Sequence, residues 1–272
     1  IITDSTCDIP DDLIAQYGII IVPQIVVWGN QQYRDHLDIS PTEFYQRLSQ
    51  ESEYPHSSMP SVPDFQQAFQ RAQAEGADEL IILTVSSAMS GTYTVAKTAA
   101  ESLKIPAAVV DSKGPTMTLG WQVLAAARAR EAGADLDSIL NQVEQVRGRL
   151  VQYVAMVTME YLQKGGRIGN AAKWAGTLLK IKPLVSINHN SGLVEPSGLY
   201  RTQKALVDGL YHKFFDHLKG AKNLRIAVLH GNDPQAGQAL AERVRAEFHP
   251  IELIINTTGP VLGINTGPGA LA

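Results

Sequence analysis

Several features that mark common protein classes are missing from this sequence of 272 residues. It contains one cysteine, Cys7, which excludes an internal disulfide framework and indicates a reducing compartment. No apolar run reaches the length of a membrane span, because Pro23 and Gln24 interrupt the longest one, residues 19–28. We also find no signal-peptide pattern. We therefore expect a cytoplasmic protein without stable membrane insertion.

The sequence also lacks an excess of positive charge and the motifs of several enzyme classes. Lys and Arg number 23 against 27 Asp and Glu, so the basic surface of a nucleic-acid-binding protein is not expected. The G-x-S-x-G elbow, the G-x-x-x-x-G-K-[ST] phosphate loop, H-E-x-x-H and paired-cysteine metal patterns are all absent. The seven histidines are scattered. We expect no metal, no cofactor and no nucleic-acid partner.

The first half of the chain alternates short Ile- and Val-rich segments with helical patterns. Such alternation indicates parallel βαβ units, in which helices cover both faces of a sheet. It predicts an N-terminal three-layer α/β/α domain. The expected strands are 1–3, 19–28, 79–85 and 107–110, and the expected helices are 41–50, 62–76, 92–103 and 117–132.

The second half predicts a mixed α/β domain. The Asn- and Gly-containing turn at 188–192 favours a hairpin, and therefore antiparallel strands. We place the domain boundary near residue 150, giving domains 1–150 and 151–272. A helix is expected at 136–150, and strands at 151–158, 184–187, 193–196, 224–230 and 251–255.

Hydroxyl groups gather where the strand at 79–85 ends. Ser86, Ser87, Ser90 and Thr92 surround Gly91, just before a predicted helix. A helix N-terminus offers unpaired N–H groups and a partial positive charge, so this arrangement suits a small anionic group. The alternative is an ordinary helix cap, but the segment holds more hydroxyls than one cap needs.

Three further segments carry polar groups that could bind a ligand. Ser57 and Ser58 precede the predicted cap Ser61, and they either form a turn or supply hydroxyls to a ligand. Arg167, in the Gly-rich loop 164–170, could hold a carboxylate or phosphate, or lie in a solvated turn. Residues 259–272 contain G-x-G-x-x-A, but without a strand-to-helix crossover we expect a tight loop presenting Asn265 and Thr266.

Six blocks in order along the whole chain resemble the DegV family. They are D-S-T-C-D at 4–8, S-S-M-P-S at 57–61, S-S-A-M-S-G-T-Y at 86–93, D-S-K at 111–113, K-G-G-R-I at 164–168 and T-G-P-G at 266–269. The resemblance implies a DegV-like fold of two α/β domains with a long-chain fatty acid, such as palmitate, between them. It further implies a non-catalytic subunit that presents the acyl carboxylate to a separate ATP-binding fatty-acid kinase subunit.

The resemblance also assigns the ligand-binding residues. It implies carboxylate contacts from the hydroxyls of Ser57, Ser58 and Ser90 and from the N–H of Gly91. It implies that Arg167 acts on the ligand head or on the kinase partner, and it places Asn265 near the carboxylate. No catalytic residue is expected.

This sequence departs from the family pattern at three of these positions. Ser57 stands where threonine is usual, Met59 where glutamine is common, and Asn265 where a histidine is common. Asparagine keeps hydrogen bonding but loses a titratable group. The apolar segment 174–181 could line a tunnel, although its residues are individually explained as core.

Two other functions are compatible with the same residues. One is a stand-alone enzyme that acts on a small organic acid or phosphorylated metabolite through Ser90 or Arg167. The other is a regulator that responds to a bound lipid. Co-purification of a fatty acid would separate the carrier from the stand-alone enzyme.

Overall fold

Four short parallel strands form the sheet of the N-terminal part. The computed structural model describes residues 1–174 and 181–272, and it orders this sheet β2-β1-β6-β7. Ile2 of β1 lies opposite both Ile20 and Ile82, and every residue of β6 is buried. A strand buried on both faces needs helices on both sides of the sheet. The strands are β1 (Ile2–Asp4), β2 (Ile20–Val22), β6 (Leu80–Thr84) and β7 (Ala107–Asp111).

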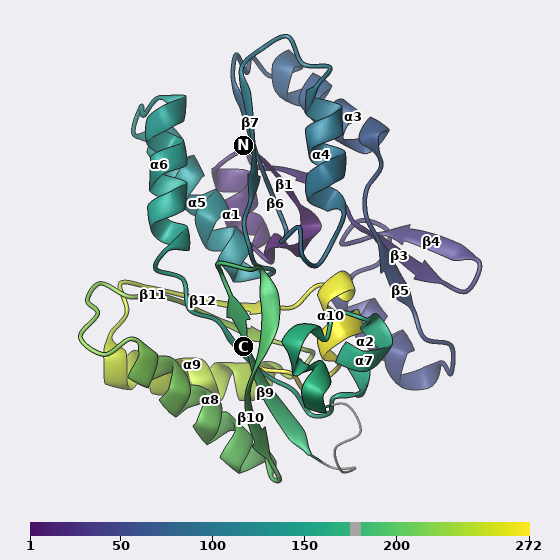
Figure 1. The fold of residues 1–272 in the computed structure, drawn as a ribbon, viewed down its shortest axis with the longest axis vertical. Coiled ribbons are helices and arrows are strands. Elements are labelled where there is room, and N and C mark those ends of the chain that lie inside the picture. The colour runs from purple at the N-terminus through teal and green to yellow at the C-terminus, as the bar shows by residue number, and fades with distance from the viewer. Residues whose placement is uncertain (175–180) are drawn as a thin grey trace. The chain divides into compact units, whose positions relative to one another are not determined.

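Helices cover both faces of this sheet (Figure 1). Apolar side chains of α3 and α4, including Phe65, Phe69 and Ala96, pack on Ile2 and Ile82. Helices α5 and α6 lie on the other side. The predicted three-layer α/β/α arrangement is confirmed. The helices are α1 (Asp11–Gln16), α3 (Val62–Ala74), α4 (Thr92–Ala100), α5 (Met117–Glu131) and α6 (Leu136–Arg147).

The expected single strand at 19–28 is two strands that belong to different sheets. Pro23 lacks an N–H and cannot continue a ladder, so β2 ends at Val22. A separate ribbon with the order β4-β3-β5 follows, in which β3 and β4 are antiparallel. Its strand β4 is polar and was not expected from the sequence. The ribbon consists of β3 (Ile25–Trp28), β4 (Gln31–Arg34) and β5 (His56–Ser58).

The second sheet region is mixed, as the hairpin turn predicts. Strands are ordered β10-β9-β8, with β8 antiparallel to β9, while β11 and β12 pair in parallel. Leu271 forms isolated bridges to Ala155 of β8 and to His230 of β11. The strands are β8 (Tyr153–Ala155), β9 (Lys182–Asn188), β10 (Leu193–Tyr200), β11 (Arg225–His230) and β12 (Glu252–Thr257).

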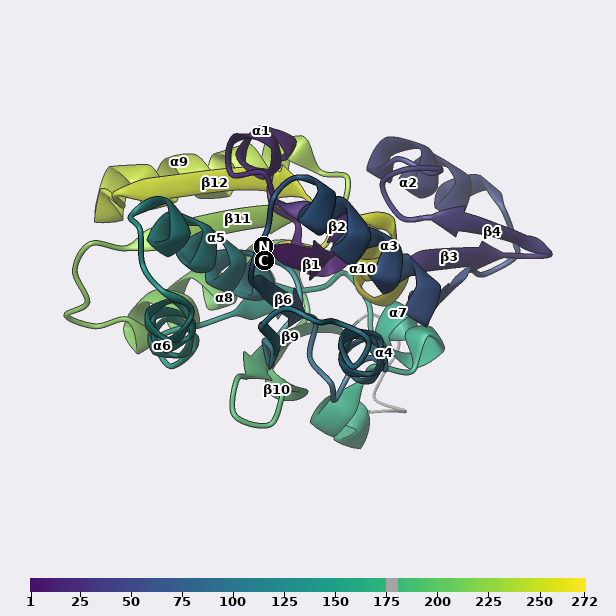
Figure 2. The same ribbon diagram turned by 90° about the horizontal axis from the view of Figure 1, so that it is seen from above.

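Two long helices, α8 (Gln203–His217) and α9 (Pro234–Phe248), supply Leu206, Leu210, Leu240 and Val244 to the core against this mixed sheet. The shorter helices α2 (Pro41–Gln50), α7 (Glu160–Gly165) and α10 (Pro260–Thr266) lie together, with α10 in contact with the other two. Figure 2 shows α8 and α9 beside the strands. Two 3-10 turns complete the fold, η1 (Ser5–Cys7) and η2 (Gly169–Trp174).

The expectation of a loop throughout 259–272 is wrong, because residues 260–266 form α10. Pro260 occupies the first helical turn, where its missing N–H costs nothing. Gly267 follows the helix with a φ of 73°, which stops it. A strand-to-helix connection that the sequence did not predict therefore exists here, from β12 to α10.

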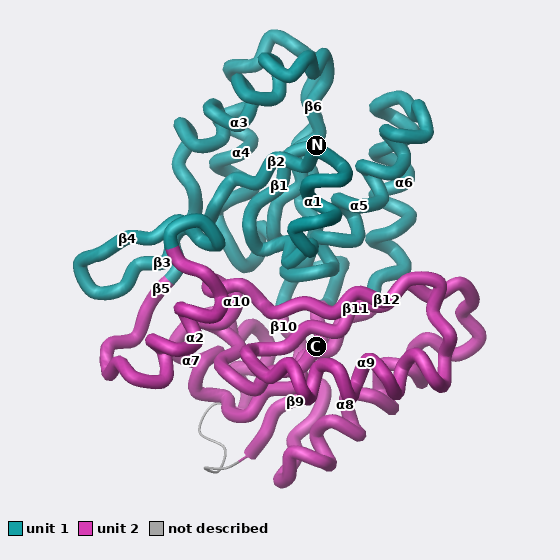
Figure 3. The backbone as a smooth tube through the Cα atoms, turned by 180° about the vertical axis from the view of Figure 1, so that it is seen from behind, with its two compact units in different colours: residues 1–38, 57–150, 188–193 teal, residues 39–56, 151–187, 194–272 magenta. Residues whose placement is uncertain are grey.

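The chain divides into two compact units (Figure 3). Unit 1 comprises residues 1–38, 57–150 and 188–193, and unit 2 comprises residues 39–56, 151–187 and 194–272. This division differs from 1–150 and 151–272 at two segments: α2 lies in unit 2, and the tip of the β9–β10 hairpin lies in unit 1. Of the segment 174–181, residues 175–180 lie outside the described part. None of the described helices is long and apolar enough to cross a membrane.

Candidate functional site

The N-terminus of α4 carries backbone N–H groups for which the described part of the chain supplies no recorded acceptor. Gly91 is the N-cap residue, and Val95 donates its N–H to the Gly91 carbonyl. Among the described residues, the N–H groups of Gly91, Tyr93 and Thr94 have no recorded acceptor. Orphan N–H groups at a helix start, together with the helix dipole, favour an anion there.

Ser90 is placed beside these N–H groups with its hydroxyl tied to Thr92. Its Oγ lies 2.8 Å from Thr92 Oγ1 and accepts the Thr92 N–H at 3.3 Å. Ser90 is partly exposed, whereas Thr92 is fully buried. Gln24 Nε2 donates to Thr92 Oγ1 at 2.9 Å. Of the residues in the hydroxyl cluster, Ser90 is therefore the one placed to meet a ligand.

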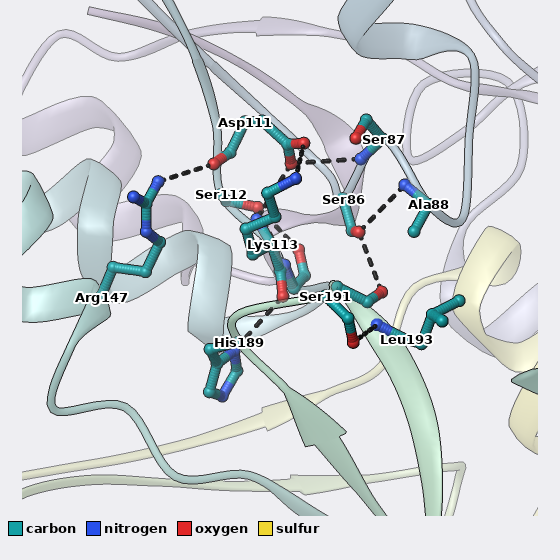
Figure 4. A network of polar contacts seen from close by, with 12 residues as sticks. Ser86, Ser87, Ala88, Asp111, Ser112, Lys113, Arg147, His189, Ser191 and Leu193 are labelled. Carbon is teal, nitrogen blue, oxygen red and sulfur yellow. Dashed lines mark hydrogen bonds and ion pairs between the residues drawn. The ribbon is translucent and has the colours of Figure 1, made fainter. Parts of the chain in front are cut away.

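Ser86 has a structural role instead. It is fully buried, donates to the Gly192 carbonyl at 2.9 Å and accepts the Ala88 N–H at 3.2 Å (Figure 4). Gly192 belongs to the hairpin tip 188–193, which is part of unit 1. A side chain at Gly192 would overlap Ser86 Oγ. The excess of hydroxyls that favoured a site is thus partly used for packing the hairpin tip.

The polar groups that follow β6 and β7 also form hydrogen bonds and ion pairs with one another. Ser87 donates its N–H to Asp111 Oδ1 at 3.1 Å, and the ammonium of Lys113 lies 2.8 Å from Asp111 Oδ2 (Figure 4). Asp111 has a lowered pKa: burial would raise it, but the bonds from Lys113 and Ser87 outweigh that effect. Arg147 Nη1 donates to the Asp111 carbonyl at 3.1 Å. These groups hold the loops of unit 1 and leave little capacity for a ligand.

Asp4 is fully buried, and three donors from neighbouring elements satisfy it. Its carboxylate accepts the Thr6 N–H at 3.0 Å, the Thr6 hydroxyl at 2.6 Å and the Val85 N–H at 2.7 Å. Burial raises the pKa of Asp4, and these hydrogen bonds oppose the rise. Asp4 therefore fastens the end of β1 to the end of β6.

Ser57 and Ser58 lie in β5, and among the described residues neither hydroxyl has a recorded protein partner. The following residue, Met59, is 48 % exposed, and a side chain at Gly91 would overlap its sulfur. The structure therefore brings segment 57–59 next to Ser90 and Gly91. Ser61 forms the predicted capping box, since its N–H donates to Asp64 Oδ2 at 2.7 Å.

Arg167 and Asn265 come together in unit 2. Arg167 Nη1 donates to the Gly165 carbonyl at 2.7 Å, and Asn265 Nδ2 donates to the Val261 carbonyl at 3.0 Å. Asn265 Oδ1 is buried and has no recorded partner among the described residues. A side chain at Gly165 would overlap that oxygen. The Gly-rich loop and the C-terminal helix, treated separately in the sequence, thus meet.

Tyr161 and Lys164 of α7 lie in this region, together with Tyr54 from the segment between α2 and β5. The Lys164 ammonium is 4.9 Å from the Tyr54 ring centroid and 2.6 Å from Glu160 Oε1. The Tyr54 hydroxyl donates to the Ile264 carbonyl, and burial raises its pKa. The Tyr161 ring covers Gly267, where no side chain would fit. These contacts fix α7 against α10 and hold Arg167 and Asn265 near each other.

Sequence reasoning missed Gln24 as part of this region. Gln24 is 3 % exposed, and its polar side chain interrupts an apolar run. That polar residue in an otherwise apolar segment was the available signal, because a buried amide requires partners.

Among the described residues, no group of three His, Cys, Asp or Glu side chains could hold a metal ion.

The family model described as "Uncharacterised protein, DegV family" matches residues 1–272. A DegV domain-containing protein of Streptomyces coelicolor is 34 % identical over 272 residues, which cover 100 % of this chain and 95 % of the relative.

Solved structures show the same fold. A Thermus thermophilus DegV family protein, reported for its fatty acid binding, has a TM-score of 0.91 at 34 % identity, covering 99 % of this chain and 96 % of that one. DegV of Bacillus subtilis, a fatty acid binding protein, has a TM-score of 0.89 at 27 % identity, covering 99 % and 95 %. With a family match along its whole length and this shared α/β fold, the chain belongs to the DegV family.

Proposed function

We propose that this protein binds a long-chain fatty acid, such as palmitate, and presents its carboxylate to a separate ATP-dependent fatty-acid kinase subunit. The observation that carries the proposal is the N-terminus of α4, where the Ser90 hydroxyl lies beside three N–H groups that have no recorded acceptor among the described residues. The hydroxyls of Ser57 and Ser58 lie on the neighbouring segment. Fatty acid binding by the Thermus and Bacillus relatives supports the choice of ligand.

The energetics of such a ligand require a carboxylate site of this kind. Each buried methylene contributes about 0.8 kcal/mol, so about a dozen contribute roughly 10 kcal/mol before ordering costs. A buried carboxylate left without hydrogen bonds would cost several kcal/mol of that affinity. Hydroxyl and N–H donors satisfy the carboxylate without adding a second charge.

The surroundings of Ser90 favour holding the ligand over attacking it. A serine nucleophile needs a base within hydrogen-bond reach to take its proton. The recorded partners of Ser90 are the hydroxyl and the N–H of Thr92, and neither is such a base. Cys7 is buried, and burial raises the pKa of its thiol well above the ordinary value, so it is not a nucleophile either.

Native mass spectrometry of the purified protein tests the proposal. A co-purifying species of fatty-acid mass, exchangeable for added palmitate, is expected. Repeated absence of lipid together with no binding of added palmitate would rule the proposal out. A stand-alone enzyme on a small acid, or a regulator, would then have to be considered.

Substituting Ser90 tests which residue holds the carboxylate. We expect Ser90→Ala to weaken palmitate binding about tenfold or more, since a hydrogen bond to a charged group is lost. Thr98→Ala is the matched control, because Thr98 lies further along the same helix and is exposed. Affinity is measured by displacement of a fluorescent fatty acid, and unchanged affinity in Ser90→Ala would remove Ser90 from the site.

Substituting Arg167 separates ligand binding from presentation to the kinase. Its guanidinium suits either a carboxylate or a phosphate-bearing partner. If Arg167 acts on the partner, Arg167→Ala lowers acyl-phosphate formation in a reconstituted assay and leaves palmitate affinity unchanged. If both are normal, Arg167 has no part in the function.

The placement of the ligand between the two units remains part of the proposal, together with a head-group contact from Asn265. A double-mutant cycle tests it. If Ser90 and Asn265 contact one carboxylate, the affinity losses of Ser90→Ala and Asn265→Ala are not additive. Additive losses would place the two residues on separate sites.

A further inference from the structure

A chain of buried hydrogen bonds leads from the interior of unit 1 to Ser90. Asp35 Oδ2 accepts the Ser5 hydroxyl at 2.6 Å, and Ser5 Oγ accepts the Gln24 N–H at 3.0 Å. The Gln24 side chain continues to Thr92, and Thr92 continues to Ser90. Asp35, Ser5 and Gln24 are at most 4 % exposed, and Thr92 is fully buried.

The orientation of the Gln24 amide is fixed by its partners. Its Nε2 donates to Thr92 Oγ1 at 2.9 Å, and the same amide helps to oppose the rise in the pKa of the Asp4 carboxyl. A carboxylate is an acceptor, so the NH₂ end of the amide must face this side. The amide NH₂ therefore donates a hydrogen bond to the Thr92 hydroxyl oxygen.

The hydrogen bond from Gln24 decides which hydroxyl donates in the Thr92–Ser90 hydrogen bond. Thr92 Oγ1 accepts from Gln24, so its own O–H needs an acceptor. Among the described residues, Ser90 Oγ is the recorded one. Reversing the bond would leave the Thr92 hydroxyl proton buried without an acceptor, which is unfavourable. Ser90 Oγ thus accepts both the O–H and the N–H of Thr92.

We propose that Gln24 and Thr92 are positioning residues that make Ser90 an obligate hydrogen-bond donor. With both Oγ lone pairs occupied, the Ser90 hydroxyl keeps one free function, its proton. That proton suits a ligand group that only accepts hydrogen bonds, such as a carboxylate. The arrangement is less favourable for an alcohol, whose oxygen can accept the same bond but whose own O–H then needs a further acceptor. The inference rests on the proposed function and deepens it by assigning the head-group selectivity.

The test compares two ligands of equal chain length, dodecanoate and 1-dodecanol, by displacement of a fluorescent fatty acid. Thr92→Val removes the hydroxyl that donates to Ser90 while keeping the side-chain shape. Gln24→Met removes the donor to Thr92. In both variants we expect the preference for dodecanoate over 1-dodecanol to fall about fivefold. Thr92→Ser restores the hydroxyl and should restore the preference.

Matched controls separate positioning from stability. Thr98→Val makes the same change at an exposed site further along α4, and it should leave the preference unchanged. A purely structural defect would weaken both ligands equally, which would overturn the inference. If Thr92→Val does not fold, Gln24→Met gives the same comparison.

The inference and the proposed function fail in different ways. If Ser90→Ala lowers the preference but Thr92→Val and Gln24→Met do not, Ser90 contacts the carboxylate without being oriented by the hydrogen bonds from Gln24 and Thr92. That result would overturn the inference. If the protein binds neither dodecanoate nor palmitate, the proposed function itself fails.

Discussion

Single atoms decide what the residues of the candidate site can do. Met59 lies against Gly91, and the buried Oδ1 of Asn265 lies against Gly165. In both places a glycine leaves the room that a neighbouring side chain occupies. Gly91 is overlapped by the flexible end of a methionine, so a substitution there is easily accommodated. The position at Gly165 is stricter, because Nδ2 of Asn265 is held by the Val261 carbonyl.

Gly165→Ala should therefore displace the Asn265 side chain. The added methyl group overlaps Oδ1, and relief requires breaking the bond to Val261, at a cost of about 1–3 kcal/mol. The side-chain amide resonance of Asn265 in NMR spectra and the free energy of unfolding both report the change. Gly148→Ala is the control, because the nearest atom to its added methyl group lies at 3.6 Å. An unchanged Asn265 resonance in Gly165→Ala would contradict the prediction.

The candidate residues could be found from the sequence, but the hydrogen-bond partners that already occupy some of their polar groups could not. Counting hydroxyls near Gly91 pointed to an anion site, and Ser90 has the exposure that a site needs. The same count could not distinguish Ser86, whose partner is Gly192, 106 positions along the chain. Hydrogen bonds between distant segments depend on the tertiary fold, which local patterns do not contain.

At the scale of elements, sequence periodicity predicted the parallel strands and the helices α3 to α6. It failed where polar or helix-breaking residues were decisive. The polar strand β4 has no apolar alternation, since it lies at the edge of its ribbon and its own residues are largely exposed. Helix α10 contains Pro260 and Gly263, which on propensity alone argue against a helix. Its buried face, including Val261 and Leu262, outweighs that propensity.

The tip of the β9–β10 hairpin should loosen in acid because of His189. Its Nδ1 lies 3.3 Å from the Lys113 carbonyl, and burial lowers its pKa from the ordinary value of 6.5 (Figure 4). The unfolded chain then binds this proton at a higher pH than the folded chain does. The free energy of unfolding consequently falls as the pH drops below about 6.5. Lys113 is itself a cation, and its ammonium pairs with Asp111, so it does not stabilise the positive charge of a protonated His189.

Denaturant titrations at pH 8 and pH 5.5 measure this effect. His189→Asn keeps a donor for the Lys113 carbonyl but cannot titrate, so it should lose less stability between the two pH values than the wild type. The comparison isolates His189, because His230, whose pKa is also lowered by burial, is present in both proteins. Equal losses in the two proteins would show that His189 does not contribute.

For the whole molecule, the last residues of the chain complete the mixed sheet of unit 2. The N–H of Leu271 donates to the Ala155 carbonyl at 2.9 Å, and the Ala155 N–H returns a bond to Leu271 at 2.7 Å. Ala272 exchanges two bonds of 2.9 Å with Leu229 of β11. Leu271 thereby joins β8 to β11. No strand pattern precedes this Gly- and Pro-rich end, so the connection could not be predicted from sequence.

Leu271→Pro should consequently open this sheet. Proline removes the N–H that Ala155 accepts, and the 1 % exposed leucine side chain is lost from the core, so we expect a loss of at least about 3 kcal/mol. Leu271→Met keeps the N–H and most of the volume, and should cost less than about 1.5 kcal/mol. Hydrogen exchange should show the amides of β8 and β11 losing protection in the proline variant. Amides of β6 belong to the separate core of unit 1 and should keep theirs. Full protection of β8 and β11 in Leu271→Pro would mean that the two strand groups are held together without the terminal bridge.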